Sequence, residues 1–187
     1  MKIADLTCRL VKIWDVPKYF DTINVTINNT YPGAGRVTLT GDGSSWSHYW
    51  NAIGEDRTIE QFVLDTNVDY LVMKLGNGIS STMNERDDDD CVTAIQQAIA
   101  RARRRGSIGK AEAREAWDDI AGSENVYNRW VYTSDFYGST RIDDDDIKWP
   151  EPPENPDYKR LEYAVIKMRE ALTQLQEQAD EKARTEG

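Results

Sequence analysis

The sequence predicts an α+β fold: an N-terminal three-stranded antiparallel meander packed on helices, then a helical hairpin and a long C-terminal helix. Two periodicities carry this prediction. Apolar and polar residues alternate in the first 40 positions, as in strands with one solvated face. After residue 58, apolar residues recur every three or four positions, as in amphipathic helices. A chain of 187 residues can bury a core without a disulfide or a metal.

Three strands are expected before residue 41. They cover residues 2–14, 23–28 and 36–40, and the alternation is cleanest in the second, where Ile23, Val25 and Ile27 point to one side. The glycines of Gly41-Asp42-Gly43 interrupt the chain after the third strand. Short links between consecutive strands favour an antiparallel meander.

Residues 45–54 are predicted to form an aromatic helix that anchors the meander to the later helices. Four apolar residues fall at i, i+3, i+4 and i+7, namely Trp46, Tyr49, Trp50 and Ile53. Gly54 would end this helix. The only histidine, His48, would lie roughly opposite the two tryptophans and be exposed.

Further helices follow. Thr58 and Gln61 have the spacing of a capping box, and residues 69–75 make a short helical segment. A strong helix is expected between the acidic residues 87–90 and the cluster Arg101 to Arg105, with acids at its start and arginines at its end, as the helix dipole favours. Lys110 to Ile120 forms its partner in a hairpin, with Ala116 or Trp117 on the apolar side.

The chain is expected to divide into four segments. Residues 1–80 hold the sheet with the aromatic and short helices, and residues 81–142 hold the hairpin with a late strand around residues 124–142. Residues 143–155 form an acidic, proline-rich linker. Residues 156–187 form a long amphipathic helix, with Asn155 as its cap and Pro156 in its first position.

The long helix carries a heptad-like seam. Its apolar residues recur at alternating spacings of three and four, and the predicted oligomer seam consists of Leu161, Val165, Met168, Leu172 and Leu175. A helix of this length is not easily covered by a small domain. It lies either along the hairpin or against a second copy of the chain, so a homodimer is one expected partner.

The net charge of −10 and the pI near 4.7 argue against a general nucleic-acid binder. The acidic excess is uneven: residues 121–187 carry 9 basic and 15 acidic side chains, and therefore −6 of the −10. We accordingly predict no direct contact with nucleic acid. No apolar run approaches the roughly 20 residues that span a bilayer, so no membrane contact is predicted.

Two runs of four aspartates are the most conspicuous polar features. They are Asp87, Asp88, Asp89 and Asp90, and Asp143, Asp144, Asp145 and Asp146; Glu151 and Glu154 follow the second run. Neither run has the alternate ligands, central glycine and closing glutamate of a calcium loop, so we predict no metal site. Solvated turns and helix starts explain the runs structurally. Their functional interpretation is an acidic surface of these ten residues that binds a partner.

Nothing in the sequence declares a catalytic site. A single histidine excludes the usual zinc sets and weakens any Ser-His-Asp arrangement. Cys8 and Cys91 sit in apolar patterns and are expected to be buried free thiols, although Cys8 with His48 is conceivable as a nucleophile pair. The glycine-containing loops lack the lysine and the following helix of a phosphate-binding loop. We expect no enzyme activity, no catalytic residue and no cofactor.

Several segments carry a resemblance to a known family. They are Gly35 to Thr40, Trp46 to Gly54, Thr58 to Phe62, Asp69 to Leu71, Glu112 to Arg114, and Trp117. Over about residues 20–120 the chain resembles accessory proteins of tailed bacteriophages and prophages, a family without an assigned activity. The resemblance implies a setting in the host bacterial cytoplasm during infection, and it transfers no catalytic residue.

The leading hypothesis is a non-enzymatic phage accessory protein that binds and inhibits a host defence or nucleic-acid-handling protein. Its acidic surface would compete as a DNA mimic for a nucleic-acid-binding site. One alternative is a structural or assembly protein that dimerises through the C-terminal helix. Another is a metal-dependent nucleic-acid enzyme that uses the aspartate runs.

Overall fold

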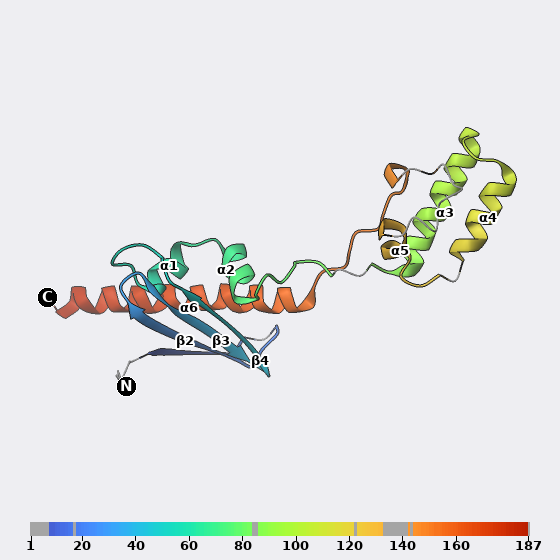
Figure 1. Cartoon of the computed structure of the whole chain (residues 1–187). Helices are drawn as coiled ribbons and strands as arrows, with labels where there is room; N and C mark the ends of the chain where they lie inside the picture. The colour runs from blue at the N-terminus through green and yellow to red at the C-terminus, as the bar shows by residue number, and fades with distance from the viewer. Residues whose placement is uncertain are drawn as a thin grey trace, which may run out of the picture. The chain divides into compact units, whose positions relative to one another are not determined.

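The computed structural model divides the chain into two compact units, whose elements are drawn in Figure 1. It describes residues 8–16, 18–83, 86–121, 123–132, 142 and 144–186. Unit 1 consists of Met1–Ser81 and Glu154–Gly187, and unit 2, Thr82–Pro153, is inserted between these two parts. Unit 2 contains 10 basic and 16 acidic side chains, so it carries −6 of the net charge of −10.

Unit 1 is built on an antiparallel sheet with the strand order β1-β2-β3-β4. The strands are β1 (Arg9–Trp14), β2 (Thr22–Tyr31), β3 (Ala34–Gly41) and β4 (Ser44–Trp50). The alternation seen in the sequence places Ile23, Val25 and Ile27 on the buried face, each at most 1% exposed. The α+β class is confirmed, but the meander has four strands instead of the predicted three.

The predicted aromatic helix is wrong, because its residues belong to β4 and the turn after it. Asp42 and Gly43 both have positive φ, 43° and 80°, as the tightest hairpin turns require, and Gly41 pairs with Ser44 across them. A short aromatic run fits both the helical and the strand period, and this turn decides between them. His48 therefore shares the inward face with Trp50, is half-buried instead of exposed, and has its ring 4.6 Å from the Trp50 ring.

Three helices cover the buried face of the sheet (Figure 1). They are α1 (Ile59–Asp65), α2 (Val68–Leu75) and α6 (Pro156–Glu186). The capping box at the start of α1 is present as predicted, with Thr58 and Gln61 bonding to each other's backbone N–H groups. At the start of α6 the Asn155 side chain accepts a hydrogen bond from the Asp157 N–H at 3.0 Å, which confirms that cap as well.

In its described residues, unit 2 consists of helices joined by turns and loops. Its elements are α3 (Asp88–Arg105), α4 (Lys110–Ile120), α5 (Val126–Tyr132) and the short 3₁₀ helix η2 (Asp144–Asp146). The hairpin of α3 and α4 is confirmed, whereas the late strand around residues 124–142 is wrong where it is described, because α5 is helical there. Unit 2 has a hydrophobic core of its own, which includes Ile95, Ile99 and Ile120, each at most 2% exposed.

The chain leaves unit 1 and returns to it at neighbouring points. Within unit 1, the Asn155 N–H donates to the Ser81 carbonyl at 2.9 Å, and within unit 2 the Met83 N–H donates to the Pro153 carbonyl at 2.8 Å. In each unit, the segment of chain that leaves and the segment that returns are therefore joined by a backbone hydrogen bond. Unit 2 is an insertion in a unit whose sheet and last helix lie far apart in the sequence.

Candidate binding surface

The first aspartate run is partly used to build unit 2. Asp87 caps α3 by accepting a hydrogen bond from the Asp90 N–H at 3.0 Å. Asp88 accepts from the N–H groups of Asn125, at 2.9 Å, and Val126, at 3.0 Å, and so ties the start of α5 to the first turn of α3. Asp89 and Asp90 are exposed and form no ion pair with another described residue.

The second run is used differently. Asp143 lies outside the described residues. Asp146 accepts hydrogen bonds from both terminal nitrogens of Arg105, at 3.0 and 2.6 Å, and its backbone carbonyl accepts one from Arg101 at 2.8 Å. The Arg105 guanidinium lowers the pKa of the Asp146 carboxyl. Two residues of the arginine cluster therefore fix η2 on α3.

The remaining predicted acids do not form one surface with these. Asp144 belongs to η2, and Asp145 and Glu151 are exposed in unit 2. Glu154 belongs to unit 1, where its carboxylate lies 3.7 Å from the Lys159 ammonium. The ten predicted partner-binding residues thus include helix caps, an ion pair and members of both units, and only some of them are free to bind.

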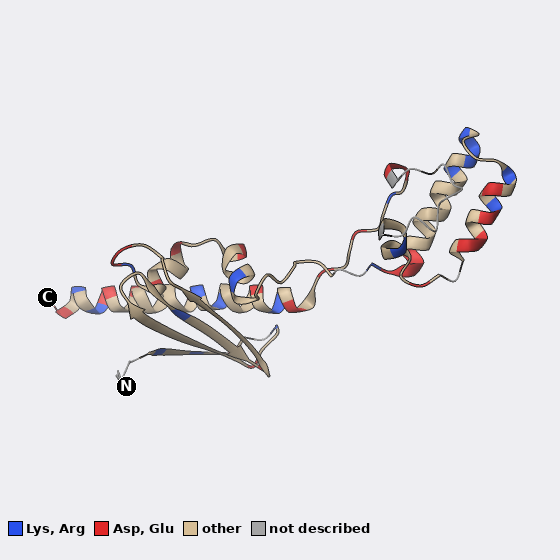
Figure 2. Cartoon of the chain, in the orientation of Figure 1, with Lys and Arg blue, Asp and Glu red and all other residues tan. Residues whose placement is uncertain are grey.

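The α3–α4 hairpin brings further carboxylates close to the exposed Asp89 and Asp90. Helices α3 and α4 are antiparallel, and the contact of Asp88 with residues 125 and 126 brings the loop after α4 back to the start of α3 (Figure 1). Five exposed carboxylates gather at that end, which we call the acidic end: Asp89, Asp90, Asp118, Asp119 and Glu124. Figure 2 shows acidic residues at this end of both helices and basic residues at the opposite end. Sequence reasoning missed the last three residues, although the expected hairpin was a sufficient signal.

The charges of α4 run against its own dipole. Lys110 occupies its first turn and Asp118 and Asp119 its last, whereas a helix dipole favours acids at the start and bases at the end. Glu112, which accepts a hydrogen bond from the Gly109 N–H at 2.6 Å, is the exception. The like-charged pairs Lys110–Arg114 and Glu115–Asp119 also sit at i,i+4, a spacing at which they repel. The pair Arg114–Asp118 attracts at the same spacing, but the dipole of α4 and its like-charged pairs do not favour this arrangement, which matches the charges of α4 to those of α3 beside it.

The residues of the predicted oligomer seam lie elsewhere. Leu161, Val165 and Met168 are fully buried and Leu172 is 3% exposed, and all four belong to the core of unit 1, against which Leu175 also packs. The heptad-like spacing is that of a helix lying on its own sheet and short helices. These side chains are not available to a second copy, so the seam is corrected to an intramolecular packing face.

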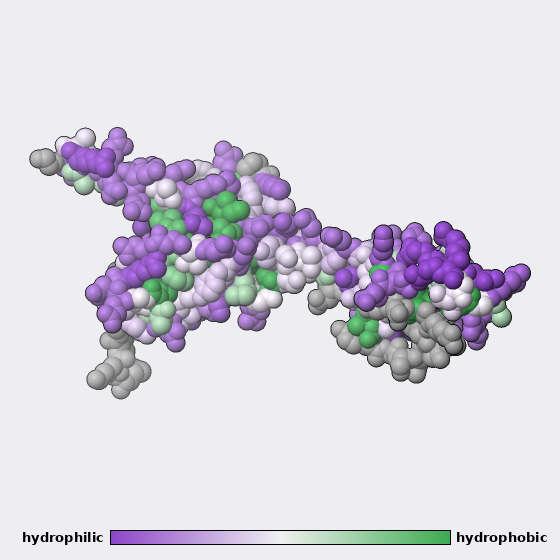
Figure 3. Space-filling view, turned by 90° about the horizontal axis from the view of Figure 1, so that it is seen from above, coloured by the Kyte–Doolittle hydropathy of each residue, from purple (hydrophilic) through white to green (hydrophobic). Residues whose placement is uncertain are grey.

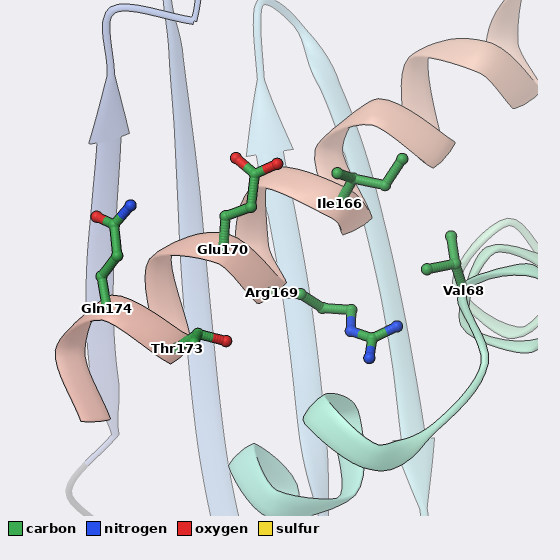
Figure 4. A pocket seen from close by; sticks show the side chains of 6 residues that line it. All are labelled: Val68, Ile166, Arg169, Glu170, Thr173 and Gln174. Atoms are coloured by element: carbon green, nitrogen blue, oxygen red, sulfur yellow. The ribbon is translucent and has the colours of Figure 1, made fainter. Parts of the chain in front are cut away.

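An open pocket of about 420 Å³ lies between the start of α2 and the outer side of α6. Figure 4 shows its lining residues, which are Val68, Ile166, Arg169, Glu170, Thr173 and Gln174. The Arg169 guanidinium donates to the Leu64 carbonyl at 2.5 Å, so its charge helps to fix α6 on α1. Figure 3 shows small hydrophobic areas enclosed by hydrophilic surface on the face of unit 1 that it presents. Nothing in the pocket identifies a ligand.

The face of the sheet opposite the helices is mostly polar, with Leu10 and Trp14 of β1 as exposed hydrophobic residues. The hydroxyl groups of Thr38 and Ser47 lie 2.8 Å apart in its centre, and the register places Thr26 and Leu10 in the same row. Arg36 stacks on Tyr49 with 5.7 Å between the guanidinium carbon and the ring centroid. Among the described strand residues this face carries no carboxylate. It provides a second flat surface, with a charge opposite to that of the acidic end.

The cysteines and the histidine do not form a nucleophile pair. Cys8 is exposed, which corrects the expected burial, and it precedes β1, whereas His48 lies on β4. These strands are opposite edges of the sheet, about 14 Å apart at roughly 4.8 Å per strand. Cys91 is buried as predicted, and burial together with the nearby Asp88 raises the pKa of its thiol, which keeps it protonated and unreactive.

The described part of the chain contains no group of three metal-ligating side chains, and no helix in it is long and apolar enough to cross a bilayer. A family model, Phage_phiTE_072, described as a phage family, matches residues 1–174. The chain belongs to this family of bacteriophage proteins, which confirms the resemblance seen in the sequence. The searches of curated proteins and of solved structures found no match.

Proposed function

We propose that this phage protein is a non-enzymatic binding protein that inhibits a host defence or nucleic-acid-handling protein. In this proposal the acidic end of unit 2 occupies a basic site on the host protein, which that protein otherwise uses for nucleic acid. The observation that carries the proposal is the reversed charge of α4, which places Asp118 and Asp119 beside Asp89 and Asp90.

The acidic end has the properties of a surface kept for a partner. Its five carboxylates are exposed and form no ion pair with a described residue, while Asp87, Asp88 and Asp146 of the same aspartate runs are engaged within unit 2. Placing acids in the last turn of α4 costs about 0.3–1 kcal/mol per charge. A partner with a basic site would neutralise these carboxylates, so the relieved repulsion would add to the binding free energy. The opposite charges of the two surfaces would also raise the association rate.

The alternatives have less support. An assembly protein that dimerises through α6 needs seam side chains that the core of unit 1 already contains. A metal-dependent enzyme needs carboxylates close enough to share a metal ion, and the described residues contain no group of three side chains that could hold one. A binding protein needs neither.

The test is affinity capture from host lysate with the full chain as bait, followed by calorimetry with the captured protein. The neutralised variant is Asp89→Asn/Asp90→Asn/Asp118→Asn/Asp119→Asn. A matched control with the same change of charge is Glu177→Gln/Asp180→Asn/Glu181→Gln/Glu186→Gln, on the exposed end of α6 in unit 1. We expect capture of a specific host partner whose affinity falls as salt is raised. The neutralised variant should lose at least tenfold in affinity, and the control should retain the affinity of the unchanged chain. Capture of no specific partner, or equal losses in both variants, would refute the proposal.

A further inference from the structure

The opposite end of the α3–α4 hairpin is strongly basic. Four exposed cations surround the turn, and we call them the basic tip: Arg103, Arg104, Lys110 and Arg114. Gly106, at φ 77°, ends α3, and Ile108, 3% exposed, anchors the turn in the core of unit 2. A buried anchor and a left-handed glycine give this turn a defined shape.

The cations of the basic tip form few contacts with the described residues, among them a hydrogen bond from Arg104 Nε to the Ala100 carbonyl at 3.3 Å. Arg101 and Arg105 hold Asp146, but none of the four forms an ion pair with a described carboxylate. The dipole of α3 explains arginines in its last turn. It does not explain Lys110 in the first turn of α4, nor Arg114 one turn later, where the two like charges repel each other. Glu112 is the one carboxylate of the turn, and it is engaged with the Gly109 N–H.

An exposed tryptophan continues the basic tip along α4. Lys110, Arg114 and Trp117 occupy positions i, i+4 and i+7, so they lie on one stripe of the helix. The Trp117 side chain is 42% exposed, whereas Ala116 and Ile120 face the core. The sequence left open whether Ala116 or Trp117 faces inward; the structure selects Ala116, which leaves an indole ring on the solvent side beside two cations.

We propose that the basic tip and Trp117 bind single-stranded nucleic acid. The four cations contact backbone phosphates, and the Trp117 ring stacks on a base. A run of cations attracts any polyanion, but a solvent-facing indole at the end of the run selects a polyanion with aromatic rings. The four cations lie toward the other end of α4 from Asp118 and Asp119, although Trp117 directly precedes Asp118; the proposal does not depend on the proposed function.

The net charge of the chain does not prevent this binding, although it led us to expect none. Helix α4 is 11 residues long and separates the two ends of the hairpin by about 16 Å at 1.5 Å per residue. The Debye length is about 8 Å at physiological ionic strength. A phosphate beside Lys110 or the α3 arginines is therefore largely screened from the carboxylates of the acidic end, whereas Arg114 lies only about 6 Å along the axis from Asp118. The base that stacks on Trp117, the residue before Asp118, carries no charge for these carboxylates to repel.

The experiment is fluorescence anisotropy of a labelled oligo(dT) titrated with the full chain over a series of salt concentrations. Four phosphate contacts predict a slope of log K against log salt of about −3. The variant Arg103→Gln/Arg104→Gln/Lys110→Gln/Arg114→Gln should lose most of the binding. The control Lys12→Gln/Lys18→Gln/Lys182→Gln/Arg184→Gln removes the same charge from exposed positions of unit 1 and should retain it.

Trp117→Ala keeps every charge and isolates the stacking. It should weaken binding by about fivefold or more, with an unchanged salt slope. An oligo(rU) arm assigns the strand to DNA or RNA, and circular dichroism verifies that each variant is folded. The proposal is overturned by absence of binding at low salt, by equal losses in the two charge variants, by full affinity of Trp117→Ala, or by equal binding of polyglutamate or duplex DNA.

Discussion

Replacing Asp118 and Asp119 by Asn should stabilise unit 2, because both carboxylates lie in the last turn of α4, where the helix dipole repels them. Asn and Asp have similar helix propensities, so the substitution isolates the charge. The attraction of Asp118 to Arg114 and its repulsion by Glu115 roughly cancel. Two unfavourable dipole interactions of about 0.3–1 kcal/mol each, and the repulsion between Asp119 and Glu115 of about 0.2–0.5 kcal/mol, then give a gain of about 0.8–2.5 kcal/mol at low salt.

The assay is hydrogen exchange of the α4 amides, read by mass spectrometry at low and at high salt. At low salt the protection of amides that exchange through opening of unit 2 should rise about 4- to 70-fold. At about 1 M salt the gain should largely vanish, since the Debye length falls to about 3 Å. The matched variant Asp89→Asn/Asp90→Asn loses a favourable dipole interaction at the start of α3, so its amide protection should rise less than that of the Asp118/Asp119 variant. Lower protection of α4 in the Asp118/Asp119 variant, or a gain that persists in high salt, would refute the assignment of a dipole cost.

Other substitutions test the remaining features of the fold. Leu161→Ala should cost about 2–5 kcal/mol in urea unfolding, with a midpoint independent of protein concentration, because the side chain belongs to its own core; a concentration-dependent midpoint would instead indicate a seam between copies. Gly43→Ala should cost about 1 kcal/mol or more through its φ of 80° alone, since an added Cβ meets no atom within 4 Å; an unchanged midpoint would argue against the β3–β4 turn. Burial, and then the charges of Lys74 and Arg36, lower the pKa of His48 in the folded state. The contribution of the neutral His48 to the free energy of unfolding is therefore fully present above the unfolded pKa of about 6.5 and declines below it. The decline, measured by urea unfolding across this pH range, should be smaller in His48→Gln, and identical profiles would contradict the inward position of the ring.

Local signals predicted the helices well. The capping box at Thr58, the cap at Asn155 and the glycine turn after Arg105 each act within one or two helical turns, so the sequence shows them directly. Residues 110–120 were assigned to a helix with the bounds that the structure gives. Local signals conflict at β4, where four apolar residues fit a helical stripe while Asp42-Gly43 is a signal for a tight hairpin turn. The turn prevails, because it pairs the segment with β3.

The arrangement of charge required the fold. The aspartate runs were visible in the sequence, but their uses depend on contacts between residues 37 to 45 positions apart, such as Asp88 with Val126 and Arg101 with Asp146. The spacing of Leu161, Val165 and Met168 was recognised, although periodicity alone does not say whether such a stripe packs on its own sheet or on another chain. For Trp117, helical periodicity alone likewise does not show whether the side chain faces the core. The packing of α4 on α3 decides this.

We propose that the acidic end of unit 2 is the surface that binds a host protein. Hydrogen exchange of the full chain, with and without the captured partner, tests it most directly. We expect added protection at residues 88–90 and 117–121 and little change over β1 to β4. Protection confined to the polar face of the sheet, with none at the acidic end, would contradict the account.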